Sequence, residues 1–391
     1  MASTAEDVTE VRAQHVMDVD KLTAYLEGQD EVKSWFKAPL VVKQFGHGQS
    51  NPTYLMRCDG GKGRAFVLRK QPPGSIISKT AHRIDREYRM MKALNKTDVP
   101  VPEMYHLCMD DGIIGKPFYI MQFCEGRIFK DASLAELPRE ERAACWKSLL
   151  EALAKIHNVD YKAVGLGDFA RAGNGYFERQ VNSLSKVSAA QEAVDPVKVP
   201  KIPQFKELGN RIIENLPEDV VSICHGDYKM DNVIFHPTES RVIAVIDWEL
   251  STLGHYGADI GNCMGPLYAP DPKTLSDEGA KGIMAIMRTV SVDEAAELGL
   301  PTRAELLKHY CSFRRPVIDF SREVQRAWYY VAFYWWKTAV ILQGIAARFA
   351  TGQASSPFAE VVGKATPSMG LLAAHAFDMY DKESASASSK L

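Results

Sequence analysis

Two polar motifs, each joined to a short apolar run, constrain this chain more than any other feature of its sequence. The first motif is His225-Gly226-Asp227-Tyr228-Lys229-Met230-Asp231-Asn232, which leads into the apolar run Val233-Ile234-Phe235. The second apolar run, Val242-Ile243-Ala244-Val245-Ile246, leads into the second motif, Asp247-Trp248-Glu249. Turn-forming residues lie between the two runs. We therefore expect the runs to pair as a β-hairpin, with one motif before it and the other after it.

The first motif has the spacing of the kinase catalytic loop H-R-D-L-x-x-x-N, with His, Asp and Asn at the same offsets. Phosphoryl transfer needs a carboxylate that orients the attacking hydroxyl and accepts its proton, and an oxygen ligand for Mg²⁺. We assign Asp227 to the first role and Asn232 to the second. Lys229 is assigned to neutralising charge on the transferring phosphoryl group. For this segment alone, a polar turn between a helix and a strand is the alternative interpretation.

The second motif supplies the partner that this interpretation needs. Asp247 ends an apolar run fifteen residues after Asn232, where kinases place the Asp of D-F-G. A carboxylate suits Mg²⁺, which prefers oxygen ligands, so Asp247 is the second predicted metal ligand. The motif reads D-W-E, and the missing Gly argues against the mobile switch of protein kinases. A single Asp at a strand end is more often a cap or turn residue, so the prediction depends on both motifs.

A glycine-rich segment near the N-terminus is the candidate phosphate-binding loop. Phe45-Gly46-His47-Gly48-Gln49-Ser50-Asn51 lies between segments 40–45 and 53–58, which read as strands. Backbone N–H groups that no Cβ obstructs can approach phosphate oxygens closely. We therefore assign Gly46, Gly48, Ser50 and Asn51 to the nucleotide site. The pattern is G-x-G-x-x-N rather than the full G-x-G-x-x-G, and a plain hairpin turn is the alternative.

The position of the kinase strand lysine falls on Arg69 when Val67-Leu68-Arg69 is aligned with A-I-K. Arg can bind phosphate oxygens through two N–H groups, so the swap keeps the charge but changes the geometry. Lys70 is the alternative, but on a strand its side chain points to the opposite face. Glu87, in the helical segment 81–94, is the predicted partner of Arg69. An exposed strand-end base and a solvated helix face are the structural alternatives.

The chain is expected to form an α+β fold with two lobes. Residues 20–37 and 81–94 read as helices, and 40–45, 53–58, 65–69, 104–109 and 118–123 read as strands. After a boundary near Glu125-Gly126 the pattern becomes mostly helical, with helices over 138–157 and 303–349. We expect a small β-rich N-lobe over 1–125, a larger α-helical C-lobe over 126–378, and a flexible tail over 379–391.

Together these segments resemble the aminoglycoside phosphotransferase or choline kinase-like superfamily, whose hallmarks are H-G-D-x-x-x-x-N and I-D-W/F-E. The resemblance is greatest to the kinase-like domain of acyl-CoA dehydrogenase family members ten and eleven. Further matching segments are Val67-Leu68-Arg69-Lys70-Gln71-Pro72-Pro73-Gly74, Glu178-Arg179-Gln180, Ile341-Leu342-Gln343-Gly344-Ile345 and Thr351-Gly352-Gln353-Ala354-Ser355-Ser356. The similarity runs from about residue 20 to residue 375.

The resemblance implies a protein kinase-like fold that binds ATP and Mg²⁺ and phosphorylates the hydroxyl of a small molecule. Gln122 and Cys124 would belong to the hinge whose backbone meets adenine, and Asp259 would be structural. The implied acceptor is a hydroxylated acyl chain, as a hydroxyacyl-CoA or a hydroxy acid. Because the relatives continue into a dehydrogenase, we expect any later elimination or oxidation to need a separate protein. An aminoglycoside or choline-type kinase and a nucleotide-binding pseudokinase scaffold are the alternatives.

Composition excludes several other classes of protein. The 391 residues include 47 Lys and Arg against 49 Asp and Glu, which excludes a nucleic-acid binder that depends on a large basic excess. The seven cysteines include no C-x-x-C pair, which excludes a zinc ribbon. No apolar stretch approaches the roughly twenty residues of a membrane-spanning helix.

The chain ends in Ser389-Lys390-Leu391, the tripeptide S-K-L. This tripeptide is an address that the peroxisomal import receptor reads. We therefore expect a peroxisomal protein; an incidental terminus on a cytoplasmic protein is the alternative.

Three other features have two interpretations each. His157 reads as a hydrogen-bonded core or cap residue rather than a catalytic one. The aromatic residues between Trp328 and Trp336 indicate either an acyl pocket or a buried helix. Arg314-Arg315 is a weak candidate for binding an anion, since exposed arginines are common.

Overall fold

The structure is a computed structural model that describes residues 2–3, 8–46, 51–72, 83–170, 175–271, 282, 284, 287–354 and 358–388. Gly48, Ser50 and the C-terminal tripeptide therefore lie outside the described residues. The chain divides into two compact units. The first comprises Met1–Lys130, Asp160–Phe169 and Asp231–Ser251, and the second comprises Asp131–Val159, Ala170–Met230 and Thr252–Leu391.

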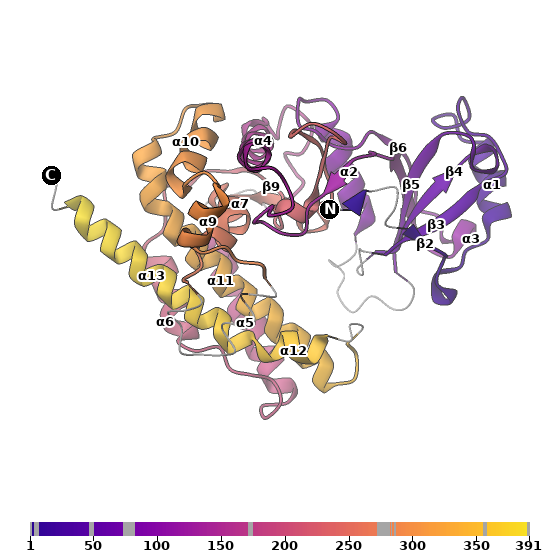
Figure 1. The fold of residues 1–391 in the computed structure, drawn as a ribbon. Coiled ribbons are helices and arrows are strands. Elements are labelled where there is room, and N and C mark those ends of the chain that lie inside the picture. The colour runs from indigo at the N-terminus through magenta and orange to yellow at the C-terminus, as the bar shows by residue number, and fades with distance from the viewer. Residues whose placement is uncertain are drawn as a thin grey trace. The chain divides into compact units, whose positions relative to one another are not determined.

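A six-stranded antiparallel sheet forms the centre of the first unit (Figure 1). In spatial order its strands are β2 (Val8–Thr9), β3 (Val41–Phe45), β4 (Thr53–Arg57), β5 (Ala65–Lys70), β7 (Phe118–Gln122) and β6 (Met104–Cys108). These bounds confirm the strands predicted from the sequence to within a residue or so at each end. Its apolar core lies on one face, where Tyr54, Phe66 and Phe118 pack with Leu22 and Leu26 of α1 (Val19–Glu27).

The helix predicted over 20–37 is shorter than expected, because α1 ends at Glu27. From Gln29 onward the chain continues in separate turns, in which the N–H of Val32 donates to Gln29 and that of Phe36 donates to Val32. Val32 and Phe36 are nevertheless buried in the core. The apolar spacing that predicted one long helix is therefore satisfied by turns that keep the same side chains inward.

The opposite face of the sheet carries α2 (Ile84–Leu94), on which Glu87 meets Arg69 of β5. Figure 1 shows α1 and α2 on the two sides of the strands. Lys70 points the other way from Arg69, and its ammonium lies 5.9 Å from the ring centroid of Tyr54. The predicted opposite orientation of Arg69 and Lys70 is confirmed.

A second, four-stranded sheet completes the first unit. Its order is β1 (Ala2–Ser3), β8 (Arg127–Ile128), β10 (Val233–Phe235) and β11 (Val242–Val245). β10 and β11 form the predicted antiparallel hairpin, and β10 also pairs with β8 through Phe235 and Arg127. This pairing places the hairpin in the first unit. The structure thus differs from the expected division at Glu125-Gly126, which assigned the hairpin to the C-lobe.

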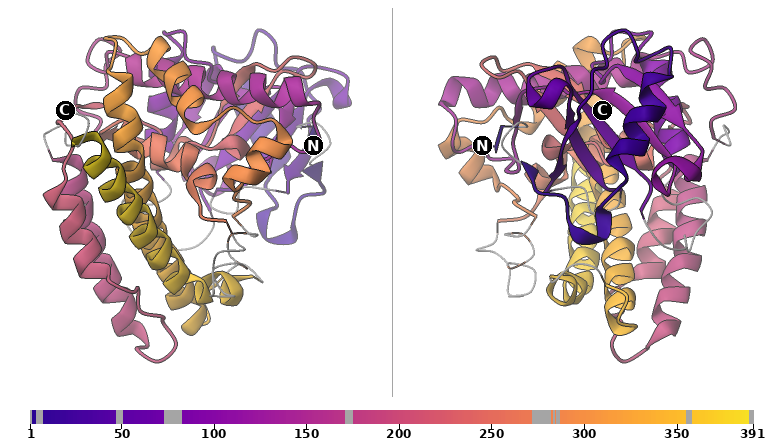
Figure 2. Two further views of the ribbon diagram at one scale, coloured as in Figure 1. Left: turned by 60° about the vertical axis from the view of Figure 1, so that its left-hand side comes forward. Right: turned by 90° about the vertical axis from the view of Figure 1, so that its right-hand side faces the viewer.

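The second unit is mostly helical. Its helices are α4 (Arg139–Asn158), α5 (Tyr176–Val194), α6 (Phe205–Glu214), α7 (Gly257–Met264), α9 (Val292–Leu298), α10 (Arg303–Phe313), α11 (Phe320–Ala350), α12 (Ala359–Lys364) and α13 (Thr366–Ser388). Two short strands, β9 (Ser222–Cys224) and β12 (Thr252–Gly254), pair antiparallel. Figure 2 shows α5 and α13 lying along α11. Within the described ranges, no helix is long and apolar enough to cross a membrane.

The helical segment predicted over 303–349 is two helices, α10 and α11, rather than one. Pro316 lies in the break, and proline has no N–H to continue a helix. Asp319 then begins α11 by accepting hydrogen bonds from the N–H groups of Ser321 and Arg322. The side chains of Trp328, Tyr329, Tyr330, Phe333, Trp335 and Trp336 on α11 are buried in the second unit. The buried-helix interpretation of this aromatic stretch is therefore confirmed.

The segment expected as a flexible tail over 379–391 begins as helix, because α13 continues to Ser388. The indole N–H of Trp328 donates to Oε1 of Glu383 at 2.9 Å. Nε2 of Gln325 donates to Oγ of Ser384 at 3.2 Å. These side-chain contacts hold this part of α13 against α11. The polar composition of the segment did not predict them.

Candidate functional site

An ion cluster in the first unit, in which Arg69 and Glu87 are buried and Asp247 is partly exposed, brings together three predicted residues. Arg69 lies near the end of β5, and only 8% of its side chain is exposed. Its Nε is 3.3 Å from Oε2 of Glu87, so the predicted pair is confirmed as an ion pair. Its Nη2 lies 2.8 Å from Oδ1 of Asp247 and 3.5 Å from Oε2 of Glu249. The guanidinium of Arg69 therefore forms ion pairs with three carboxylates.

The cluster contains more negative than positive charge. Burial raises the pKa of Glu87 above its ordinary value; Arg69 opposes this, whereas Asp247 and Glu249 add to it. Burial also disfavours the charged form of Arg69, but Glu87 and Asp247 keep the pKa of Arg69 well above its ordinary value. The guanidinium thus stays charged. The remaining excess of carboxylate favours binding of a further cation.

The β10–β11 hairpin brings the two predicted metal ligands, Asn232 and Asp247, to one end of the four-stranded sheet. Val233 pairs with Val245, and the N–H of Ile246 donates to the backbone oxygen of Asn232 at 3.0 Å. Asn232 and Asp247 therefore meet at the open end of the hairpin. Asp247 also has a left-handed backbone conformation, with φ 65°. Residues other than glycine rarely adopt it, and such strained positions cluster at functional sites.

The donor atoms at this end of the hairpin fit a Mg²⁺ ion. Mg²⁺ prefers carboxylate and amide oxygens, which Asp247 and Asn232 supply. Asn51 is buried nearby, with Nδ2 3.4 Å from Oε2 of Glu249. Its Oδ1 has no hydrogen-bond partner in the described part of the chain. An unsatisfied buried oxygen is costly, and a cation would satisfy it.

Of the predicted hinge residues, Gln122 is the last residue of β7 and Cys124 lies two residues after it. The N–H of Gln122 donates to the backbone oxygen of Glu103 at 2.8 Å. Burial raises the pKa of the Cys124 thiol to about 12, so this thiol is neutral at ordinary pH. The adenine-binding role of both residues stays a prediction. Of the residues assigned to the phosphate-binding loop, the structure describes Gly46 and Asn51.

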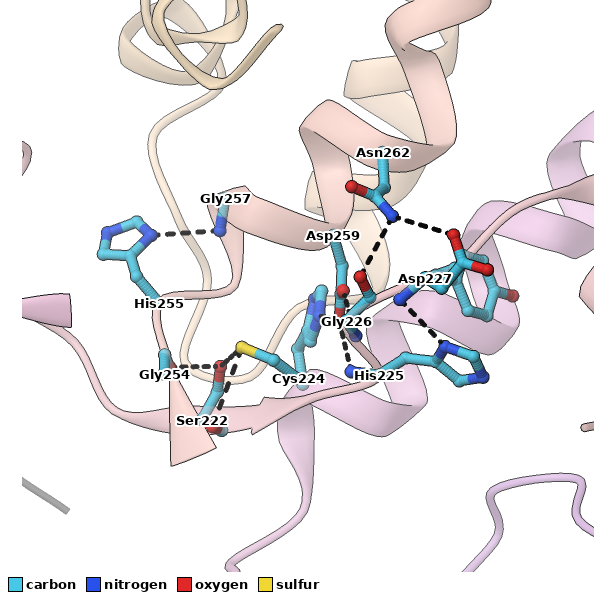
Figure 3. A network of polar contacts seen from close by, with 12 residues as sticks. Ser222, Cys224, His225, Gly226, Asp227, Gly254, His255, Gly257, Asp259 and Asn262 are labelled. Carbon is cyan, nitrogen blue, oxygen red and sulfur yellow. Dashed lines mark hydrogen bonds and ion pairs between the residues drawn. The ribbon is translucent and has the colours of Figure 1, made fainter. Parts of the chain in front are cut away.

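In the second unit, one buried carboxylate holds the predicted catalytic loop (Figure 3). Asp259 of α7 accepts hydrogen bonds from the N–H of His225 at 2.7 Å and from that of Gly226 at 2.8 Å. Nε2 of His157 lies 3.3 Å from the same carboxylate. Burial opposes ionisation of Asp259, but its hydrogen bond with His157 and the N–H of Gly226 help keep its pKa below the ordinary value. Asp259 thus fixes the backbone just before Asp227.

The turn of this loop needs glycine at position 226. Gly226 has φ 87°, in the left-handed region that a Cβ disfavours. Its carbonyl oxygen accepts from Nδ2 of Asn262 at 3.2 Å, and the same Nδ2 lies 3.5 Å from Oδ1 of Asp227. Nζ of Lys229 lies 3.3 Å from Oδ2 of Asp227. The carboxylate of Asp227 is therefore contacted on both of its oxygens.

The sequence motifs do not reveal two polar residues of this site, Asn262 and Lys337. Asp259 and Asn262 are three residues apart on α7, so they share a helix face, and this spacing was the available signal. Lys337 donates to the carbonyl oxygen of Gly226 at 3.2 Å and to Oδ1 of Asn262 at 3.1 Å. No local sequence pattern predicts a role for Lys337, because only the packing of α11 places it beside the Asp227 loop.

Two residues with open interpretations are structural. His157 is buried, with Nδ1 2.8 Å from the hydroxyl of Tyr310, as the core interpretation predicted. Arg314 is also buried: it donates to Oδ1 of Asn158, and its guanidinium lies 5.2 Å from the ring centroid of Tyr256. Arg314 thus joins internal elements of the second unit and offers no exposed anion site.

Residues 41–283 match the Phosphotransferase enzyme family. The chain belongs to this family. The matched range includes Arg69, Glu87, Asp227, Asn232 and Asp247, whereas Lys337 lies outside it. The predicted relationship to small-molecule phosphotransferases is therefore confirmed.

A curated relative supports the closer resemblance. Acyl-CoA dehydrogenase family member 10 of Mus musculus is 39% identical over 365 residues, which cover 93% of this chain and 31% of the relative. The chain thus spans less than half the length of the curated relatives it matches.

Solved structures confirm the kinase-like, two-lobed α+β fold. A Ralstonia eutropha JMP134 protein assigned to the aminoglycoside phosphotransferases is 36% identical, with a TM-score of 0.73 over 92% of this chain and 98% of that chain. Aminoglycoside phosphotransferase APH(4)-Ia, in a ternary complex with ADP and hygromycin B, is 15% identical, with a TM-score of 0.51 over 83% and 92% of the two chains. The second similarity shows the fold alone.

Proposed function

We propose that the chain transfers the γ-phosphate of Mg-ATP to the hydroxyl group of a small molecule. The arrangement of Asp227 carries this proposal. Asp259 holds the backbone of its loop and Asn262 contacts its carboxylate, while 35% of the Asp227 side chain is exposed. A carboxylate that is fixed in place yet accessible is what proton transfer from a bound hydroxyl requires.

In the proposed reaction, Asp227 orients the substrate hydroxyl and accepts its proton. The hydroxyl oxygen forms a bond to the γ-phosphorus, and the bond from that phosphorus to the bridging oxygen breaks as ADP leaves. Lys229, beside Asp227, neutralises charge on the transferring group.

The first unit is proposed to hold the nucleotide. Asn232 and Asp247 would bind Mg²⁺, which when bound neutralises the nucleotide phosphates. Arg69, oriented by Glu87, would contact phosphate oxygens in place of the usual lysine. The remaining nucleotide contacts are assigned to Gly46, Gly48, Ser50, Asn51, Gln122 and Cys124. The similar fold of APH(4)-Ia, which was solved with ADP, supports nucleotide binding.

One observation favours a second candidate, a nucleotide-binding scaffold without turnover. Nη2 of Arg69 contacts Asp247, so a metal ion at Asp247 has to share that carboxylate with the guanidinium. A chain in which the ion pair persists would bind nucleotide through its other contacts but transfer no phosphate. The measurements below separate the two candidates.

We further propose a hydroxylated acyl chain as the acceptor, in the form of a hydroxyacyl-CoA or a hydroxy acid. The support is that a relative named for acyl-CoA chemistry contains a segment that matches 93% of this chain. An aminoglycoside or choline-type acceptor is the alternative, supported by the assignment of the Ralstonia eutropha protein.

Mg-ATP is expected to raise the melting temperature of the chain, and ATP with EDTA to raise it much less, because Asp247 and Asn232 would hold Mg²⁺ and its charge would favour binding of the phosphates. A ligand at 100 times its Kd stabilises a protein by about 2.7 kcal/mol. Thermal-shift measurements with Mg-ATP, ATP with EDTA, and Mg²⁺ alone test this. The absence of any shift with Mg-ATP would contradict the kinase assignment.

An ATP-consumption screen over hydroxy acids, hydroxyacyl-CoAs, choline and aminoglycosides then identifies the acceptor class. The matched acyl-CoAs that lack the hydroxyl are the control and should consume no ATP. Binding of Mg-ATP without turnover on any acceptor would favour the scaffold.

We also propose import into peroxisomes through Ser389-Lys390-Leu391, on the strength of the tripeptide itself. Deleting the three residues is expected to leave an N-terminally tagged chain in the cytosol, as fluorescence microscopy would show. The undeleted tagged chain is the control. Peroxisomal fluorescence that survives the deletion would remove this proposal.

A further inference from the structure

Two helices of the second unit, α7 and α11, pack closely beside the catalytic loop. A Cβ built on Gly257 would lie 2.2 Å from the ring of Tyr330, and one on Gly261 would lie 2.3 Å from the backbone oxygen of Tyr330. A Cβ on Gly265 would lie 2.5 Å from the ring of Tyr334. The three glycines recur every four residues, on one side of α7 and its continuation. Their lack of side chains lets α11 lie directly against α7.

Lys337 is a polar residue on this face of α11. It follows Tyr330 by seven residues and Tyr334 by three, a spacing that keeps all three on one side of a helix. Its neighbours in the chain, Trp336 and Thr338, are buried. Because α11 packs closely against α7, the ammonium of Lys337 lies within hydrogen-bonding distance of two oxygens. It is 3.2 Å from the carbonyl oxygen of Gly226 and 3.1 Å from Oδ1 of Asn262.

The ammonium on one side, and the oxygens of Gly226 and Asp227 on the other, fix which way the Asn262 amide faces. A lysine ammonium has only donors, so it requires the amide oxygen of Asn262 on its side. The amide nitrogen is then turned toward the oxygens of Gly226 and Asp227, as Figure 3 shows. In the flipped amide, two donors would meet at the lysine and the amide oxygen would face two other acceptors. Both contacts would be lost.

We propose that Lys337 and Asn262 are positioning residues for Asp227, in which Lys337 locks the Asn262 amide and Asn262 holds the Asp227 carboxylate ready for the substrate hydroxyl. This inference rests on the proposed phosphotransferase function. The lock acts on the proton-accepting carboxylate and not on the nucleotide contacts assigned to the first unit. Its loss is therefore expected to lower kcat and to leave KM for ATP unchanged.

The charge of Lys337 also makes the lock sensitive to pH. Burial lowers the pKa of Lys337, while the groups that face it act in the opposite direction: Asp227 of the loop, Asp259 of α7 and Cys224 of β9. A neutral amine has a lone pair and can accept a hydrogen bond, so it no longer imposes one orientation on Asn262. We therefore expect kcat to fall on the alkaline side of its pH profile, below the ordinary titration range of lysine.

Substitution of Lys337 tests the proposal. Lys337→Met is expected to lower kcat by about 10- to 100-fold, the loss typical of one charge-assisted hydrogen bond, with KM for ATP within about twofold of the wild type. Lys337→Arg keeps a permanent charge, so it should restore much of kcat and move the alkaline limb to higher pH. Lys206→Met, at an exposed position on α6, is the matched control and should leave kcat unchanged.

A double-variant cycle sharpens the test. Asn262→Ala should lower kcat about as much as Lys337→Met, and the double variant should lose no more than either single variant, because both remove the same contact with Asp227. Fully additive losses, or a Lys337→Met enzyme with wild-type kcat, would overturn the proposal. Melting temperatures of all variants show whether each is folded.

A crystal structure of Lys337→Met keeps this inference separate from the proposed function. Without the ammonium, Oδ1 of Asn262 loses its donor, so the lock predicts that the Asn262 side chain leaves its contact with Asp227 in the variant. If the wild type transfers no phosphate to any acceptor, the proposed function fails, yet this structure still tests the lock. An Asn262 amide that keeps its contact with Asp227 without Lys337 would refute it.

Discussion

Asp227→Asn is expected to lower the rate of phosphate transfer by about 10²- to 10⁴-fold, the usual contribution of a general base. An amide of the same size cannot accept the proton of the attacking hydroxyl. Mg-ATP should still raise the melting temperature of the variant as much as that of the wild type, because the proposed nucleotide contacts are other residues. Initial rates of ADP formation with the best acceptor from the screen measure the first effect, and thermal shifts measure the second.

The matched control for this substitution is Asp293→Asn, the same chemical change at an exposed position of α9. It should leave both the rate and the thermal shift unchanged. A second comparison uses ATP alone, without acceptor. If the wild type consumes ATP under that condition at a rate that Asp227→Asn matches, Asp227 is not the base of the observed reaction.

Arg69→Met is expected to lower the free energy of unfolding by about 3–5 kcal/mol, because it leaves the buried carboxylate of Glu87 without its cation. The penalty should depend on pH. The pKa of Glu87 is raised by burial above its ordinary value of 4.5, so the folded state binds a proton more tightly than the unfolded state does. The stabilisation from that proton is full below pH 4.5 and is lost as the pH rises through the folded-state pKa. Urea unfolding at pH 5 and pH 8 should therefore show the larger loss at pH 8.

A double variant separates the structural role of Arg69 from its role toward nucleotide. Arg69→Met with Glu87→Gln removes both charges of the buried pair, so most of the lost stability should return. The affinity for Mg-ATP should stay low, because the proposed phosphate contact is still missing. A double variant that binds Mg-ATP as tightly as the wild type would show that Arg69 is structural only.

Much of the first unit could be predicted from the sequence because its signals are local. Strands such as β4 and β5 are short apolar runs bounded by turn residues, and the alternation of their side chains already separated Arg69 from Lys70. Helix lengths were less predictable. The apolar spacing after Glu27 fits a continuous helix and a series of turns equally well, so it did not reveal that α1 ends there.

Residues far apart in the sequence were predicted to meet only where a motif linked them. Arg69 and Glu87 were paired in this way, and the structure places them 3.3 Å apart. Asn262 and Lys337 belong to no such motif, although both contact the Asp227 loop directly. Their presence follows from the contact between α7 and α11.

The sequence by itself determined the family and the residues proposed for the chemistry, because the groups that perform phosphoryl transfer stand in short contiguous motifs with fixed spacing. Only the tertiary structure decided that the β10–β11 hairpin belongs to the first unit, and which residues hold Asp227 in place. The physical reason is that these outcomes depend on strand pairing and on glycines of α7 fitting against tyrosines of α11. Such complementarity arises between segments that are distant in the chain, so the local periodicity of apolar residues does not predict it.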